Sequence, residues 1–213
     1  MEPGFRHAFS AAWQAYCDGN IPIGAAILNE DGAVVAVGRN SVYGKRPVGT
    51  VSNHPLAHAE LNAILQVNGL TDEQVGRYTL YTTMEPCPLC FGATVMGRIR
   101  RLRFAARDEY AGAAGLNGAT EFLRRERLDI TGPDPLLEGL QIALIVARRL
   151  HLALAGSEEF LTMYRRDCPL GVAVGERLAQ SGWLEEKAAA SASADVVCDH
   201  VLLRLMEGSA SAI

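Results

Sequence analysis

The feature that most constrains this chain is a pair of cysteines set among prolines, in the segment PCPLC at residues 86–90. Proline is tolerated in a first helical turn, where backbone N–H groups have no intrahelical acceptor, so the segment predicts a helix start. The positive end of the helix dipole lowers the pKa of thiols, so Cys87 and Cys90 can bind a metal ion as thiolates. His58 is a third candidate ligand. Three protein ligands leave one zinc position open for water, which is typical of a catalytic site.

Glu60 follows His58 by two residues, close enough to reach a zinc-bound water without serving as a ligand. Such a water has a pKa near ~7, and a neighbouring carboxylate can pass its proton to a leaving amine. A structural zinc knot and a redox-active dithiol are the alternatives. A knot would need a fourth ligand nearby, but the other cysteines are isolated: Cys17, Cys168 and Cys198. A redox pair explains neither His58 nor Glu60, so the pattern favours a catalytic zinc.

Composition narrows the class of protein. The 213 residues suggest one domain, or one domain with an appendage. Five cysteines at uneven spacing do not resemble a disulfide framework, which favours a reducing, cytoplasmic setting. We expect no secretory leader and no membrane association, because the longest apolar stretch, residues 136–154, carries too many polar side chains to span a bilayer. The formal net charge of −4 argues against a broad phosphate-binding face.

Hydrophobic periodicity and turn residues predict alternating helices and strands. The predicted helices cover residues 2–19, 55–67, 87–96, 119–127 and 134–155, and the predicted strands cover 21–28, 33–37, 78–83, 101–106 and 128–131. This order indicates an α/β fold, a three-layer α/β/α sandwich around a central mixed five-stranded sheet. It places His58 and Glu60 in the first two turns of one helix, after a long loop at 41–53 that is a candidate substrate wall.

Residues 156–213 are predicted to form a helical extension that packs on the core or on a partner subunit, next to a domain at 1–155. Apolar residues recur at helical spacing over 172–184, an alanine- and serine-rich linker covers 188–194, and a last helix covers 196–206. A second interpretation is that Phe160 or Tyr164 of this extension closes over a ligand.

Together these segments resemble the cytidine deaminase-like superfamily of zinc-dependent nucleobase and nucleoside deaminases. Besides HAE at 58–60 and the cysteine segment, the resemblance rests on IPIGA at 21–25, GRN at 38–40, and ARD with GAAG between 106 and 115. It covers residues 21–154 and is greatest to bacterial tRNA adenosine deaminases and guanine deaminases. It implies hydrolytic deamination of a ring at a zinc ion, in an enzyme that is commonly a homodimer.

Transferred by position, the resemblance makes His58, Cys87 and Cys90 the zinc ligands and Glu60 the proton shuttle. It further implies three substrate contacts: the Asn40 side chain, the backbone N–H of Ala59, and Asp108 near the pocket mouth. Asn40 and Asp108 also have simpler interpretations. Asparagine is a frequent turn former, and Asp108 can cap the turn that follows it. The loop at 41–53 is longer than in close relatives, which leaves the substrate open.

The predicted function is therefore a zinc-dependent hydrolytic deaminase of a small nucleobase, nucleoside or related amino-heterocycle. Zinc-bound hydroxide would attack the amino-bearing ring carbon and release ammonia. The alternative is a tRNA adenosine-to-inosine deaminase. Two arginine clusters offer a possible tRNA footprint: Arg98, Arg100, Arg101 and Arg103, then Arg124, Arg125 and Arg127. A third hypothesis, a zinc-stabilised scaffold without activity, is disfavoured because Glu60 is present.

Overall fold

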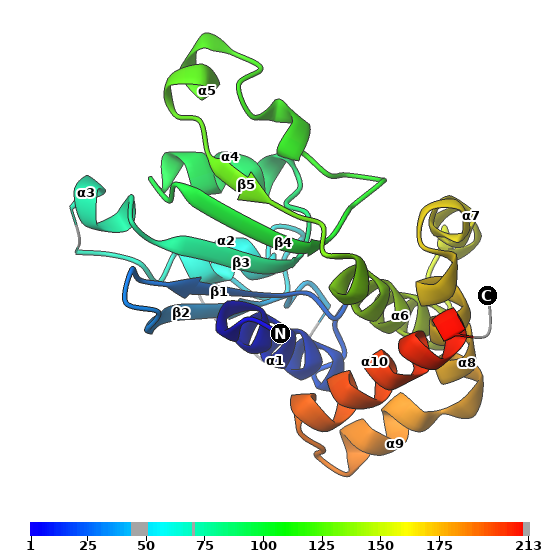
Figure 1. The fold of residues 1–213 in the computed structure, drawn as a ribbon. Helices are drawn as coiled ribbons and strands as arrows, with labels where there is room; N and C mark the ends of the chain where they lie inside the picture. Colours follow the sequence, from blue (N-terminus) through cyan, green and yellow to red (C-terminus); the bar gives the residue numbers. More distant parts are fainter. Residues whose placement is uncertain (44–50, 70, 211–213) are drawn as a thin grey trace.

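A computed structural model describes residues 1–43, 51–69 and 71–210. Its centre is a five-stranded sheet in the order β2-β1-β3-β4-β5 (Figure 1). The strands are β1 (Gly24–Leu28), β2 (Val34–Arg39), β3 (Thr79–Met84), β4 (Arg101–Ala106) and β5 (Asp129–Thr131). β1 runs antiparallel to both β2 and β3, whereas β3, β4 and β5 are parallel. The predicted mixed sheet of five strands is confirmed.

Helices cover both faces of this sheet. One face carries α1 (Pro3–Cys17) and α6 (Pro135–His151), and the other carries α2 (Ala59–Ile64) and α4 (Pro88–Met96). The alternation of side chains along a strand divides the core in two. On the α2 and α4 side, strand residues Ile27 and Leu80 pack with Ala63 and Phe91. The predicted three-layer α/β/α sandwich is therefore confirmed.

Two glycines bring helices into direct contact with strands. A Cβ atom at Gly24 of β1 would lie 2.0 Å from the carbonyl oxygen of Ala8 in α1. A Cβ atom at Gly38 of β2 would lie 2.0 Å from the carbonyl oxygen of Ala59 in α2. Only glycine permits such an approach, so Gly24 and Gly38 determine how closely α1 and α2 pack on the sheet.

The helix that follows the long loop starts later than predicted. α2 begins at Ala59, and His58 is its N-cap residue, with extended backbone at φ −79° and ψ 153°. The prediction that His58 lies in the first two turns was wrong, although Glu60 does lie in the first turn. The reason is a tertiary hydrogen bond, since the backbone N–H of Ser41 binds the Ala57 carbonyl at 2.9 Å. Because its carbonyl is used in that bond, Ala57 is not part of the helix, and residues 55–58 form turns and extended backbone instead. Residues 44–50 of the predicted loop lie outside the described residues.

The chain between α2 and α6 also contains short helices. α3 (Asp72–Val75) was not predicted and begins with a capping box at Thr71 and Gln74. A 3-10 turn, η1 (Ala114–Leu116), precedes α5 (Glu121–Arg125), which is shorter than the predicted helix over 119–127. Val75 of α3 is buried in the same cluster as Ala63 and Phe91, and Leu123 of α5 packs against that cluster.

The C-terminal extension consists of four helices in the described residues, grouped beside α6 (Figure 1). They are α7 (Ser157–Asp167), α8 (Pro169–Ser181), α9 (Trp183–Ala189) and α10 (Ala194–Ala210). Val174 of α8 and Val201 of α10 belong to the same apolar cluster as Phe9 of α1 and Leu140 of α6. α9 takes up the first part of the predicted linker at 188–194. No helix among the described residues is long and apolar enough to cross a bilayer.

Candidate active site

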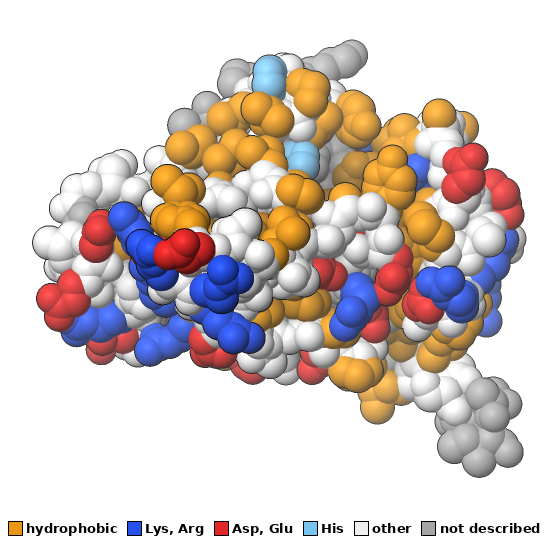
Figure 2. All heavy atoms as spheres, turned by 90° about the horizontal axis from the view of Figure 1, so that it is seen from above, with side chains coloured by type: hydrophobic (Ala, Val, Ile, Leu, Met, Phe, Trp, Pro, Cys, Tyr) orange, Lys and Arg blue, Asp and Glu red, His pale blue; other side chains and the backbone are white. Residues whose placement is uncertain are grey.

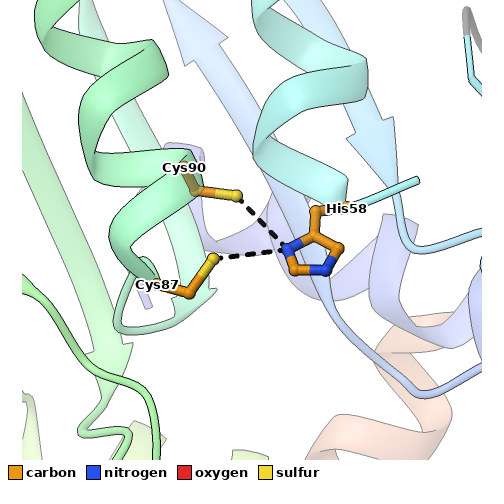
Figure 3. Close-up of side chains that lie close together, drawn as sticks. All are labelled: His58, Cys87 and Cys90. Carbon is orange, nitrogen blue, oxygen red and sulfur yellow. Dashed lines mark hydrogen bonds between the residues drawn. The ribbon is translucent and has the colours of Figure 1, made fainter. Parts of the chain in front are cut away.

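Three potential metal ligands converge where α2 and α4 begin. The Nδ1 atom of His58 lies 3.5 Å from the sulfur of Cys87 and 3.4 Å from the sulfur of Cys90. Figure 3 shows the imidazole ring facing both sulfurs. All three ligand atoms lie within 4.8 Å of one another. The structure thus brings together the three residues that the sequence singled out.

This donor set fits a zinc ion. Zn–N and Zn–S bonds of about 2.0 and 2.3 Å at a tetrahedral angle place the nitrogen and sulfur about 3.5 Å apart. The observed separations of 3.4 and 3.5 Å agree with that value. Nitrogen and sulfur donors also match the preference of zinc. His58 additionally hydrogen-bonds the Pro55 carbonyl, a contact that orients a ligating imidazole.

The elements explain why the ligands meet. His58 and Cys87 are the N-cap residues of α2 and α4, and Cys90 lies one turn into α4. Hydrogen bonding by Cys90 and His58 lowers the pKa of Cys87 to about 4, whereas the Cys87 contact and burial raise the pKa of Cys90. The lowered pKa of Cys87 favours its thiolate, the form that binds a metal ion.

Glu60 lies beside the ligand cluster, in contact with Cys90. Its side chain is 4% exposed and accepts a hydrogen bond from the Thr82 hydroxyl of β3 at 3.3 Å. Burial, the largest influence, raises the pKa of Glu60, while the positive charge of His58 opposes that effect. A carboxyl group with a raised pKa, held at the base of a cavity, is suited to accepting and releasing protons.

A cavity of about 160 Å³ opens in front of these groups. Every predicted site residue except the buried Cys90 lines it. Its lining residues are Ile21, Ile23, Asn40, His58, Ala59, Glu60, Met84, Glu85, Cys87, Asp108 and Ala111. A larger cavity of about 690 Å³ lies between α8, α9 and α10, but the described residues around it include no cluster of metal ligands. The chemistry is concentrated in the smaller cavity.

Asn40 and Ala59 present polar groups to this cavity. The side-chain carbonyl of Asn40 accepts a hydrogen bond from the Val42 backbone at 3.3 Å. In the part of the chain that the structure describes, the Asn40 amide nitrogen has no partner, so it is free to bind a ligand. The Ala59 N–H is the first amide of α2, where helical geometry supplies no acceptor.

Asp108 caps the turn that follows it, which is the simpler of the two roles considered for it from the sequence. One carboxylate oxygen accepts hydrogen bonds from the backbone of Tyr110 and Ala111, both at 3.0 Å. Burial raises the pKa of Asp108, and these backbone donors oppose that effect. The same side chain lines the cavity, so capping and ligand contact are compatible.

Sequence reasoning missed two residues that organise the site. The carboxylate of Glu85 accepts hydrogen bonds from the backbone of Asp108 at 3.3 Å and Ala114 at 3.0 Å. The buried Asn62 binds the carbonyls of Arg39 and Val51, at 3.1 and 3.0 Å, and so ties α2 to both ends of the long loop. Both side chains serve backbone groups distant in sequence, which no local pattern reveals.

Comparison with known proteins agrees with this geometry. Residues 2–106 match the model of the cytidine and deoxycytidylate deaminase zinc-binding region. The chain belongs to the cytidine deaminase-like superfamily. A solved structure of NE0047 in complex with 2,6-diaminopurine shows the same fold, with a TM-score of 0.51 at 24% identity over 69% of this chain and 81% of that one.

Two curated members of the superfamily show which activities occur among its relatives. The tRNA-specific adenosine deaminase of Haemophilus influenzae is 37% identical over 117 residues, which are 54% of this chain and 62% of that protein. The guanine deaminase of Bacillus subtilis is 40% identical over 97 residues, 45% of this chain and 57% of that protein. The matches span less than two thirds of either relative. They support a deaminase of the zinc-binding family and leave its substrate undetermined.

Proposed function

We propose that this chain is a zinc-dependent hydrolytic deaminase of a nucleobase, nucleoside or related small amino-heterocycle. The observation that carries the proposal is that one small cavity is lined by two of the three candidate metal ligands, His58 and Cys87, and by the buried Glu60 side chain. A scaffold without activity would need neither the cavity nor a carboxyl group beside the metal ligands.

His58, Cys87 and Cys90 would hold the zinc ion, because their donor atoms already have the required separation. When bound, zinc supplies Lewis-acid activation of water near neutral pH. Glu60 accepts a proton from the attacking water and delivers it to the leaving amine nitrogen. The Thr82 hydroxyl keeps the Glu60 carboxyl oriented for both transfers.

The remaining polar groups would bind the ring. The free amide nitrogen of Asn40 donates to a ring or carbonyl acceptor, and the Ala59 N–H donates to a second acceptor. Asp108 accepts from a donor at the cavity mouth. Ile21, Ile23 and Met84 supply apolar walls for a flat ring. A cavity of about 160 Å³ is smaller than the ~300–1,000 Å³ of drug-sized ligand pockets, which favours a single base.

The tRNA alternative is less well supported by the surface charges. Arg98 and Arg100 both pair with Glu126, and Arg103 pairs with Asp129. Figure 2 shows basic and acidic side chains interspersed on one face of the molecule. Arginines neutralised in this way release few counterions on binding a phosphate backbone. A steep loss of tRNA affinity with added salt would favour the alternative.

We further infer a homodimer. Exposed apolar side chains lie next to the two site helices: Leu56, Leu65 and Met96. Large apolar side chains left exposed beside a site support a subunit interface there. Light scattering of the purified chain measures its oligomeric state, and a monomer at every concentration would contradict this inference.

The function is tested by ammonia release from the zinc-loaded chain. The substrates are a panel of bases, nucleosides and mononucleotides, with a tRNA anticodon stem-loop beside them. We expect turnover of at least one small substrate. The Glu60→Gln variant removes the proton acceptor but keeps its shape, so turnover should fall by about 10²–10⁴-fold. Its zinc content should equal that of the unmodified chain.

Glu126→Gln is the matched control, because Glu126 binds Arg100 and does not line the cavity. It should leave turnover unchanged. An undiminished rate in Glu60→Gln would eliminate the proposed proton transfer. Turnover of the stem-loop alone would favour the tRNA deaminase. No turnover of any substrate by a zinc-loaded, folded chain would favour the inactive scaffold.

A further inference from the structure

Tyr164 of α7 holds the loop that carries Asp108. Its side chain is 1% exposed and does not line the cavity. Its hydroxyl accepts a hydrogen bond from the Glu109 backbone N–H at 3.1 Å and donates to the Arg107 carbonyl at 3.2 Å. The two bonds therefore fasten the backbone on both sides of Asp108. The hydroxyl also lies near the Asp108 carboxylate, since burial and then the negative charge of Asp108 raise the pKa of Tyr164.

The tyrosine ring is fixed by its own packing. It packs against Phe160 with ring centroids 4.5 Å apart and ring planes tilted by 36°, and the Arg149 guanidinium lies 4.8 Å from the Phe160 centroid. Tyr164 shares an apolar cluster with Leu161 of the same helix and with Met84, a cavity wall. Burial raises the pKa of Tyr164, so the group stays a neutral hydroxyl that both donates and accepts. α7 is thus a rigid support for the hydroxyl.

Glu85 holds the same loop from the other side, through the backbone of Asp108 and Ala114. Any Cβ atom at Gly112 would lie 2.6 Å from the Glu85 carboxylate, so the loop wraps closely around that side chain. The loop is therefore fixed from within residues 1–155 by Glu85 and from the extension by Tyr164.

From these contacts we infer that Tyr164 is a positioning residue for substrate, acting through Asp108. By fixing the backbone at Arg107 and Glu109, it keeps the Asp108 carboxylate at the cavity mouth. The inference rests on the proposed function, and it gives the C-terminal extension a part in substrate affinity. Neither Phe160 nor Tyr164 needs to close over the ligand for this role.

Tyr164→Phe removes the hydroxyl and keeps the ring. Tyr16→Phe is the matched control, since Tyr16 is also buried, and its hydroxyl binds Glu185 away from the cavity. Amide hydrogen exchange needs no substrate. We expect exchange at residues 107–111 to become at least about fivefold faster in Tyr164→Phe, the factor for one lost hydrogen bond. Tyr16→Phe should leave it unchanged. Unaltered exchange in Tyr164→Phe would overturn the inference.

Kinetics on the best substrate of the panel test the role through Asp108. Tyr164→Phe should raise KM about fivefold and change kcat less than about twofold, because it weakens substrate positioning but not proton transfer. In an Asp108→Ala background the same change should have no further effect on kcat/KM. Independent, multiplying effects of the two substitutions would overturn the inference. If the unmodified chain turns over nothing, the proposed function fails instead, which distinguishes the two failures.

Discussion

At the residue scale, the two cysteines of the site differ from the other three in what surrounds them. Cys87 and Cys90 lie within 3.5 Å of the His58 ring nitrogen, whereas the structure places Cys17 on the surface. A serine at position 87 would keep the size of the side chain but would not be a thiolate at neutral pH. The substitution therefore tests the loss of a metal ligand with little change in side-chain packing.

We expect Cys87→Ser to weaken zinc binding by at least ~100-fold, since even partners outside the ligand set contribute ~10–100-fold. Thermal stability should fall with the metal, because a metal that binds the folded state stabilises it. Metal analysis and the midpoint of thermal unfolding measure both effects. Cys17→Ser should change neither. Full zinc occupancy in Cys87→Ser would exclude Cys87 as a ligand.

At the element scale, the position of α2 depends on Gly38 of the neighbouring strand. Since a Cβ atom there would lie 2.0 Å from the Ala59 carbonyl, the helix that begins beside His58 and carries Glu60 must shift to admit any side chain. Gly115, by contrast, is exposed, and a Cβ atom there would meet nothing within 4 Å.

Gly38→Ala should lower the free energy of unfolding by about 1–3 kcal/mol, the usual effect of overpacking. It should also weaken zinc binding, because His58 moves with the start of α2. Gly115→Ala should stay within about 0.5 kcal/mol of the unmodified chain. Urea unfolding and metal titration measure the two quantities. Equal stability of the two variants would show that α2 does not depend on the glycine contact.

Local signals predicted some elements with accuracy. β4 has the predicted limits, and the helix predicted from residue 134 has Asp134 as its N-cap, whose side chain accepts hydrogen bonds from the backbone of Leu136 and Leu137. Both features depend on residues within a few positions of one another. The start of α2 depends instead on the Ser41 bond to Ala57, and the support of Asp108 depends on Tyr164. Contacts between residues so far apart leave no periodic trace in the sequence.

At the scale of the whole molecule, the extension and the sheet domain share buried surface. Val201 of α10 is fully buried in the cluster that contains Phe9 and Leu140, whereas Leu203 on the same helix is 53% exposed. The division into a domain at 1–155 and an extension at 156–213 remains a prediction. The shared cluster provides a way to test whether the two parts unfold together.

Val201→Ser should lower the free energy of unfolding by about 2–4 kcal/mol, through lost apolar burial and a buried hydroxyl. Leu203→Ser should change it by less than about 0.5 kcal/mol. If the chain is one cooperative unit, the single calorimetric transition moves as a whole. Two transitions, of which Val201→Ser moves only one, would indicate independent domains.

The bond from the Trp13 indole N–H to the Ala192 carbonyl, 2.8 Å long, joins residues 179 positions apart. During translation at ~5–20 residues per second, α1 would therefore wait roughly 9–36 s before α9 and α10 emerge to complete its surroundings. Many small domains fold in far less time than that. The side of the first helix that packs on α10 thus lacks its final partner for many seconds after it is made, although the strands that cover its other side are made earlier.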